Sequence, residues 1–150
     1  MNRKGFTLVE IMIVVAIIAL LAAIAIPNLL RARHNANEAA AQSTLKSIST
    51  AAESFRSAQT TPAYPANDGA MTGATPPYLD AGIFAAAGRQ GYIFSYTQLN
   101  NNQYVACGIP AVYQTSGTRT FAINETGVLR ALDNTAAVIN TVAGYNGMTV

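Results

Sequence analysis

The feature that most constrains this chain is an apolar run near the N-terminus that contains a single carboxylate. Residues 6–26 number 21, and Glu10 is the only charged side chain among them. As an α-helix the run would measure about 30 Å, the thickness of the hydrocarbon core of a bilayer. A carboxylate in hydrocarbon costs about 2.5–3.5 kcal/mol or more. The sequence therefore predicts that Glu10 has a compensating partner and a functional role.

Two ordinary interpretations of this run leave Glu10 unexplained. A secretory signal would use Arg3 and Lys4 as its basic region and end at the Ala23-Ile24-Ala25 pattern, with cleavage after Ala25. Its apolar part would then exceed the usual length of about 7–15 residues. A simple single-pass anchor is the second interpretation. Basic residues flank both ends of the run, so charge alone does not set the orientation of such an anchor.

A third interpretation accounts for the carboxylate. The residues Lys4-Gly5-Phe6-Thr7-Leu8-Val9-Glu10-Ile11-Met12-Ile13-Val14-Val15 closely resemble the class III signal and first helix of the type IV pilin family. This family includes pilus subunits and the pseudopilins of type II secretion, and the resemblance continues through Ala22-Ala23-Ile24-Ala25-Ile26-Pro27. It implies cleavage after Gly5 by a prepilin peptidase, N-methylation of Phe6, and polymerisation of the processed chain through its N-terminal helix.

The resemblance also implies a role for Glu10. Cleavage creates an ammonium on Phe6, and Glu10 of one copy is expected to neutralise this amine on a neighbouring copy. Opposite charges attract strongly in a low-dielectric core, so the pair would set the axial register of assembly. Pro27 is predicted to kink a helix that continues beyond the membrane.

Three further charged residues are candidates for pairing between neighbouring copies: Arg31, Arg33 and Glu38. A solvated helix face or contact with lipid headgroups is the equal alternative for them.

The expected partners and location follow from the same resemblance. They are other copies of the chain, a prepilin peptidase and methyltransferase, and an inner-membrane assembly platform with a cytoplasmic ATPase. A single-pass precursor in the inner membrane would become an extracellular type IV pilus that serves adhesion, motility or DNA uptake. The nearest alternative is a pseudopilin, which would form a periplasmic pseudopilus. A more distant alternative is a secreted binding protein cut after Ala25.

The fold predicted for the chain is α+β, the pilin fold, in which a long N-terminal helix packs on a small antiparallel sheet of about four strands. The expected organisation is a leader (1–5), a membrane and polymerisation half of the helix (6–27), an amphipathic half (28–58), a connecting loop region (59–90), and a sheet with a C-terminal tail (91–150). In the amphipathic half, Leu45, Ile48, Ala52 and Phe55 recur at helical spacing, which predicts a stripe that packs on the sheet.

Alternating residues and turn signals predict four strands, at 91–97, 103–109, 119–124 and 128–130, and a short helix is predicted around 78–87. Pilins often close their C-terminal region with a disulfide, which a chain with one cysteine, Cys107, cannot form. Residues 132–150 are therefore expected to be held by packing or left loose. Cys107 itself is predicted to be a small buried hydrophobe.

Charge and motif content exclude several classes of function. Without residues 1–5 the chain has seven basic and seven acidic side chains, so it lacks the excess of positive charge that nucleic-acid binding requires. His34 is the only histidine, and neither a hydrolase triad nor a zinc cluster is indicated. There is no P-loop or dinucleotide-binding glycine pattern. The sequence thus predicts a chain that is not an enzyme and has no cofactor.

Two short motifs receive structural interpretations. Asp133-Asn134 resembles part of a calcium site, but too few carboxylates surround it, so no metal is predicted. Asn124-Glu125-Thr126 matches the N-glycosylation sequon, but it lies in a predicted turn where Asn serves the backbone.

Overall fold

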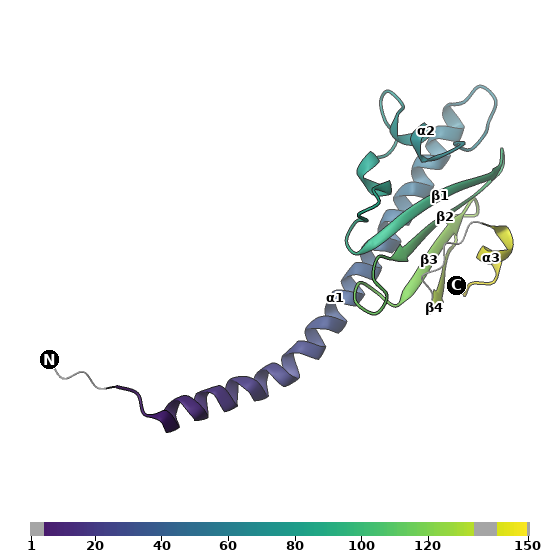
Figure 1. The fold of residues 1–150 in the computed structure, drawn as a ribbon. Coiled ribbons are helices and arrows are strands. Elements are labelled where there is room, and N and C mark those ends of the chain that lie inside the picture. The colour runs from purple at the N-terminus through teal and green to yellow at the C-terminus, as the bar shows by residue number, and fades with distance from the viewer. Residues whose placement is uncertain (1–4, 134–140, 150) are drawn as a thin grey trace. The chain divides into compact units, whose positions relative to one another are not determined.

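A computed structural model describes residues 5–133 and 141–149 of the chain (Figure 1). The chain divides into two units, Met1–Arg33 and His34–Val150, and helix α1 (Leu8–Ala58) runs through both. Residues 1–4 of the predicted leader lie outside the described residues, as do residues 134–140 and 150 of the predicted tail.

The N-terminal unit consists mainly of the first half of α1. Its large apolar side chains are exposed along the whole of this half, from Leu8 at 75% to Leu30 at 49%. Pro27 lies inside α1, and the helix continues beyond it, which confirms the predicted long N-terminal helix. The predicted kink at Pro27 stays a prediction.

The second unit contains a four-stranded antiparallel sheet in the order β1-β2-β3-β4, which confirms the α+β prediction. The strands are β1 (Tyr92–Asn100), β2 (Gln103–Pro110), β3 (Arg119–Asn124) and β4 (Leu129–Asp133). Strand β1 is longer than predicted, because pairing with β2 continues up to the turn at residues 101–102. The side chain of Asn100 supports this end, since it donates to Oε1 of Gln103 across 2.7 Å.

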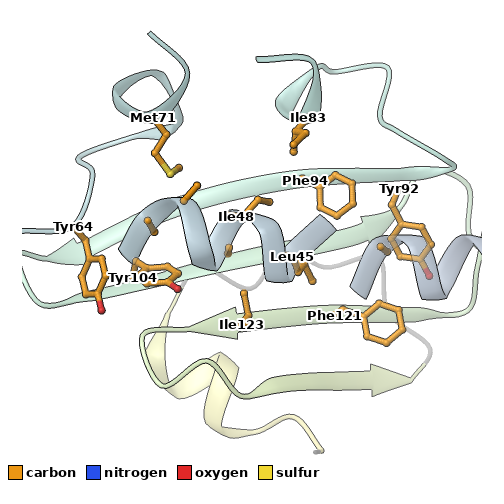
Figure 2. Packing of buried hydrophobic residues seen from close by; sticks show 14 residues of the cluster. Leu45, Ile48, Tyr64, Met71, Ile83, Tyr92, Phe94, Tyr104, Phe121 and Ile123 are labelled. Carbon is orange, nitrogen blue, oxygen red and sulfur yellow. The ribbon is translucent and has the colours of Figure 1, made fainter. Parts of the chain in front are cut away.

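One face of the sheet packs on the second half of α1. Alternate strand residues point toward the helix, where Leu45, Ile48 and Ala52 are fully buried, as the predicted stripe requires (Figure 2). Phe55, the last residue of the stripe, is half-buried and meets Tyr78 edge to face at 5.6 Å. The strand residues of this core are Tyr92, Phe94, Tyr104, Ala106, Phe121 and Ile123.

The opposite face of the sheet is covered by the C-terminal segment, which the sequence did not assign to an element. Helix α3 (Val142–Asn146) places Tyr145 and Met148 against Val105 and Ala122. Thr149 then exchanges two backbone hydrogen bonds with Ala131 of β4, at 2.7 and 2.9 Å. Residues 141–149 are therefore held by packing, the first of the two expectations for this region.

The connecting region contains two short helices, each of which places one buried side chain against the core. Helix α2 (Asp68–Thr72), which was not predicted, begins at the N-cap Asn67 and buries Met71. The helix predicted around 78–87 is shorter, a single 3-10 turn η1 (Ala81–Phe84) that buries Ile83. This turn ends at Ala85, because the backbone of Ala85 is extended and its N–H donates to the carbonyl of Gly82.

Candidate functional site

The start of α1 is closed by a reciprocal set of hydrogen bonds between Thr7 and Glu10. The backbone N–H and the hydroxyl of Thr7 both donate to Oε2 of Glu10, each at 2.8 Å. In return the N–H of Glu10 donates to Oγ1 of Thr7 at 3.2 Å, and the carbonyl of Thr7 accepts the first helical bond, from Ile11. This is a capping box, in which two side chains satisfy donors that a helix N-terminus leaves open.

The capping box supplies a local partner for the carboxylate. Negative charge is also favoured in the first turn of a helix, because the N-terminal end of the helix dipole is positive. Both hydrogen bonds that Thr7 donates end on Oε2 of Glu10. Within the part of the chain that the structure describes, Oε1 accepts none, so it can accept a hydrogen bond from a further donor. Thr7 was missed as a site residue at the sequence level, although the spacing Thr-x-x-Glu before an apolar run is the signature of such a box.

Gly5 and Phe6 lie beside this box and are exposed. Phe6 is 84% exposed, and an added Cβ at Gly5 would meet no atom within 4 Å. Packing within the described chain therefore does not require glycine at position 5. Gly5, Phe6, Thr7 and Glu10 together line a shallow surface hollow of about 350 Å³.

Beyond Glu10 the helix is long and apolar enough to span a membrane. An 18-residue window of α1 has a mean hydropathy of 3.0, and none of it is buried inside the structure. Exposed apolar surface on this scale is unfavourable in water, at about 25 cal/mol for each Å². This surface therefore belongs in a bilayer or against other protein. Arg31 and Arg33, which follow it, are exposed.

Glu38 occupies a different environment from the two arginines. The residue is 5% exposed, and Nη2 and Nε of Arg119 donate to Oε2 of its carboxylate at 2.6 and 2.9 Å. The N–H and hydroxyl of Thr118 donate to Oε1, each at 3.2 Å. Glu38 is thus neutralised within its own chain. We retain only Arg31 and Arg33 as candidates for pairing between copies.

The pKa of Glu38 reflects this geometry. Burial alone would raise the pKa, but the hydrogen bonds and charge of Arg119, together with Thr118, outweigh burial and hold the pKa below its ordinary value. The pKa of Arg119 is raised in turn, chiefly by its hydrogen bonds to Glu38. The pair therefore stays ionised at neutral pH and ties α1 to the start of β3.

The other residues considered at the sequence level have structural roles in the second unit. Asn124 is 6% exposed, and its Oδ1 accepts from the N–H of Thr126 at 3.1 Å and from its hydroxyl at 2.6 Å. This confirms that the sequon asparagine serves the turn. Cys107 is buried in β2, as predicted. Among residues 5–133 and 141–149, no group of three His, Cys, Asp or Glu side chains could hold a metal ion.

Comparison with known proteins gives a family match at the N-terminal end of the chain and partial matches to curated pilus proteins. Residues 1–26 match the family described as the prokaryotic N-terminal methylation motif. Over 54 residues the chain is 50% identical to the type IV major pilin protein PilA of Myxococcus xanthus, which is 36% of this chain and 24% of that protein. Over 37 residues it is 68% identical to the type IV wide pilus major component PilA4 of Thermus thermophilus, 25% of this chain and 28% of that protein.

The family match covers the segment that contains Gly5, Phe6, Thr7 and Glu10. The chain spans about a quarter of the length of these curated relatives. Similarity of this extent covers at most 36% of the chain, so the sheet of the second unit is interpreted from its own structure.

Proposed function

We propose that this chain is a type IV pilin, a structural subunit that is processed after Gly5 and polymerised into a type IV pilus, and its matches to the N-terminal methylation motif and to two pilus major components support this. The observation that carries the proposal is the arrangement at the start of α1. An open glycine and an exposed Phe6 directly precede a capped helix, and Oε1 of its first carboxylate, Glu10, accepts no hydrogen bond from the part of the chain that the structure describes. Each of these features has a use in assembly.

Processing comes first. The open surroundings of Gly5 make the following bond accessible to a prepilin peptidase, and the requirement for glycine would come from the pocket of that enzyme. Cleavage turns the N–H of Phe6 into an ammonium, which the methyltransferase activity of the same partner would N-methylate. Thr7 and Glu10 lie after the cut, so the capping box can survive it.

Register would come from Glu10. In the precursor its Oε2 is held by Thr7, which orients the carboxylate and lowers the cost of keeping it in the bilayer. In the filament Oε1 would accept the ammonium of Phe6 from a neighbouring copy. A buried charge whose partner is missing is costly, so a copy added out of register would be disfavoured.

Cohesion would come from the exposed apolar half of α1. Its side chains are solvated by lipid in the precursor and would pack against the same segment of other copies in the filament. Arg31 and Arg33 follow this segment and would pair with neighbouring copies or contact headgroups. An inner-membrane platform driven by a cytoplasmic ATPase would supply the work of extraction. The product would lie outside the cell.

The first test is the mature N-terminus, identified by mass spectrometry of the protein from its native membrane or filaments. We expect N-methylated Phe6. A terminus at Ile26 would instead indicate an ordinary secretory signal and overturn the proposal. Replacing Gly5 with Leu should leave the precursor uncut, whereas a mature product of normal size from that variant would contradict cleavage after Gly5.

The second test separates the charge of Glu10 from its capping role. Glu10→Gln keeps an acceptor for Thr7 but removes the charge, whereas Glu10→Ala removes both. We expect both variants to insert into the membrane and both to fail in filament assembly, scored by electron microscopy and by the pellet of sheared filaments. Normal filaments from Glu10→Gln would refute the register role and leave only capping.

Imaging of cells that express the chain decides between a type IV pilus and a pseudopilus, whose subunits share the same N-terminal processing and helix. Long surface filaments that contain the chain support a pilus. A secretion defect on deletion of its gene, with no such filaments, would indicate a pseudopilus.

A further inference from the structure

Glu10 borders a second surface hollow besides the one that it shares with Gly5 and Thr7. This second hollow, which we call the Glu10 hollow, measures about 310 Å³. Glu10, Ile13 and Val14 are three and four residues apart, so the turns of α1 bring them to one face of the helix. Apart from the carboxylate of Glu10, the side chains that line the hollow are apolar. The lining residues are Phe6, Glu10, Ile11, Ile13 and Val14.

Processing affects the two hollows differently. Gly5 lines the first hollow, and it leaves with the leader when the chain is cut after it. The five residues that line the Glu10 hollow all come after Gly5 in the sequence, so they remain in the mature chain. The Glu10 hollow therefore keeps its lining residues in the subunit that assembles.

The carboxylate gives the hollow a charge and one free acceptor. Oε2 of Glu10 accepts two hydrogen bonds from Thr7, each at 2.8 Å, whereas Oε1 accepts none from residues 5–133 or 141–149. An ordinary ammonium has three N–H donors, and a donor that is buried among apolar groups without an acceptor is costly. The hollow is thus suited to a cation that has few donors and carries apolar groups.

The N-terminus of a processed copy has this chemistry. Cleavage leaves an ammonium on Phe6, and N-methylation replaces one of its N–H donors with a methyl group while the positive charge remains. The methyl group and the phenyl ring of Phe6 are both apolar, so both are stabilised by leaving water for apolar side chains. The methylated terminus therefore matches the hollow in charge, in number of donors and in apolar character.

We propose that the Glu10 hollow receives the N-methylated Phe6 of a second copy, with the ammonium at the carboxylate and the methyl group against Val14 and Ile13. The proposal rests on the processed subunit of the proposed function. It gives methylation a role in assembly, because an unmethylated terminus would bring one more unpaired donor into the hollow. Pairing of charges sets the position of the terminus, and the apolar lining selects its methylated form.

The position of Val14 makes the contact measurable. Val14 lies six residues after Leu8, where α1 begins, which is a rise of about 9 Å. The methyl group of the same chain is attached before this start, so it lies beyond the range of short-range magnetisation transfer to Val14. A contact between the methyl group and Val14 therefore identifies a second copy.

Solid-state nuclear magnetic resonance of intact filaments tests the inference. Cells receive valine labelled with carbon-13 and methionine labelled with carbon-13 at its methyl group, which is the source of the methyl group on Phe6. The N-methyl signal is distinct from the S-methyl signals of the methionine residues. Filaments are compared from the native chain, from Val14→Leu, and from the matched control Val15→Leu. Val15 is an exposed valine that does not line the hollow.

We expect transfer between the N-methyl group and the γ carbons of valine in native filaments and in Val15→Leu, and its loss in Val14→Leu. A valine contact that survives in Val14→Leu, or that is lost equally in Val15→Leu, would overturn the inference. Labelled isoleucine in native filaments is a second measurement that needs no variant. Ile11 and Ile13 line the hollow, so the methyl group should contact isoleucine too.

These outcomes are distinct from failure of the pilus proposal. Methylated native filaments in which the methyl group contacts neither valine nor isoleucine would overturn the use of the Glu10 hollow and leave the pilus proposal intact. Absence of filaments, or filaments whose Phe6 carries no methyl group, would overturn the proposed function and this inference with it.

Discussion

At the scale of single residues, Glu10 and Glu38, two carboxylates of α1, are satisfied in opposite ways. Glu10 receives its hydrogen bonds from Thr7, three residues away. Glu38 receives its hydrogen bonds from Thr118 and Arg119, which are 80 and 81 residues away. The first arrangement follows from helix capping and needs no fold, whereas the second forms only when β3 lies against α1. The consequences of removing each carboxylate differ accordingly.

Glu38→Gln should destabilise the second unit by about 1–3 kcal/mol at neutral pH, because it removes the charge that Arg119 and Thr118 bind. We place the value no higher, because the side chain of Arg119 is 42% exposed and water screens the pair. Unfolding by urea in detergent, followed by near-ultraviolet circular dichroism of the seven tyrosines, measures it. Asp80→Asn is the control, since that carboxylate is 70% exposed and its pair with Arg89 should contribute little.

The same pair predicts a dependence on pH. The pKa of Glu38 is lower in the folded chain than its ordinary value, so its stabilisation is complete above the ordinary pKa and is lost as the pH falls through the folded pKa. The native chain should therefore lose more free energy of unfolding on acidification below about pH 4.5 than Glu38→Gln loses. Parallel pH profiles for the two proteins would show that Glu38 is not the group involved.

Thr7→Val should weaken the start of α1, because valine has the shape of threonine but no hydroxyl to exchange with Glu10. Loss of a capping side chain costs about 0.5–2 kcal/mol. Amide hydrogen exchange in micelles should become faster for residues 8–11, while Thr7→Ser should behave as the native chain does. Unchanged exchange in Thr7→Val would contradict the capping box.

At the scale of elements, the side chain of Arg130 on β4 binds the C-terminal segment, in addition to the backbone hydrogen bonds between Thr149 and Ala131. Nη1 of Arg130 donates to the carbonyls of Asn146 and Met148 at 3.1 and 3.3 Å, and its guanidinium lies 4.8 Å from the ring of Tyr145. The hydroxyl of Tyr145 donates to the carbonyl of Val128. The guanidinium of Arg130 and the ring of Tyr145 thus hold the C-terminal segment on the face of the sheet opposite α1.

Arg130→Met should therefore release residues 141–149 while leaving the sheet folded. The loss of two charge-assisted hydrogen bonds and of the ring contact should raise local exchange in α3 by more than in β2. Hydrogen exchange with mass spectrometry measures both elements in one experiment. Arg89→Met is the matched control, because that arginine is half-exposed and pairs with an exposed Asp80 at 3.5 Å. Equal increases of exchange in α3 for the two variants would contradict the role of Arg130 in holding the C-terminal segment.

At the scale of the whole molecule, one helix carries two kinds of apolar surface. Leu45 is fully buried against the sheet, whereas Leu29 is 70% exposed. Leu45→Ala should destabilise the second unit by about 2–5 kcal/mol, through lost transfer energy and the cavity that remains. Leu29→Ala should change that stability by less than about 0.5 kcal/mol but reduce the yield of filaments. Urea unfolding and sheared-filament yield separate the two effects, and a filament yield unchanged by Leu29→Ala would count against the apolar half as an assembly surface.

Features that depend on neighbours along the chain could be predicted. The long helix, the four strands and the buried stripe through Leu45 and Ile48 follow from periodicity and turn residues, which act within a few residues of each other. The Thr7–Glu10 box also had a local signature, which was not recognised at the sequence level. Boundaries were less accurate, because backbone pairing carried β1 up to Asn100, beyond the predicted end at residue 97.

Features that join distant parts of the chain could not be predicted. No local pattern indicated that Glu38 would meet Arg119, or that α3 would cover the second face of the sheet through Tyr145 and Arg130. Such contacts form only once the strands are in register, and the free energy comes from burying groups that are neighbours in space alone. The apolar helix and its carboxylate are therefore properties of the local sequence. The neutralisation of Glu38 and the fastening of the C-terminal segment are properties of the folded chain, because they require segments that the fold alone brings together.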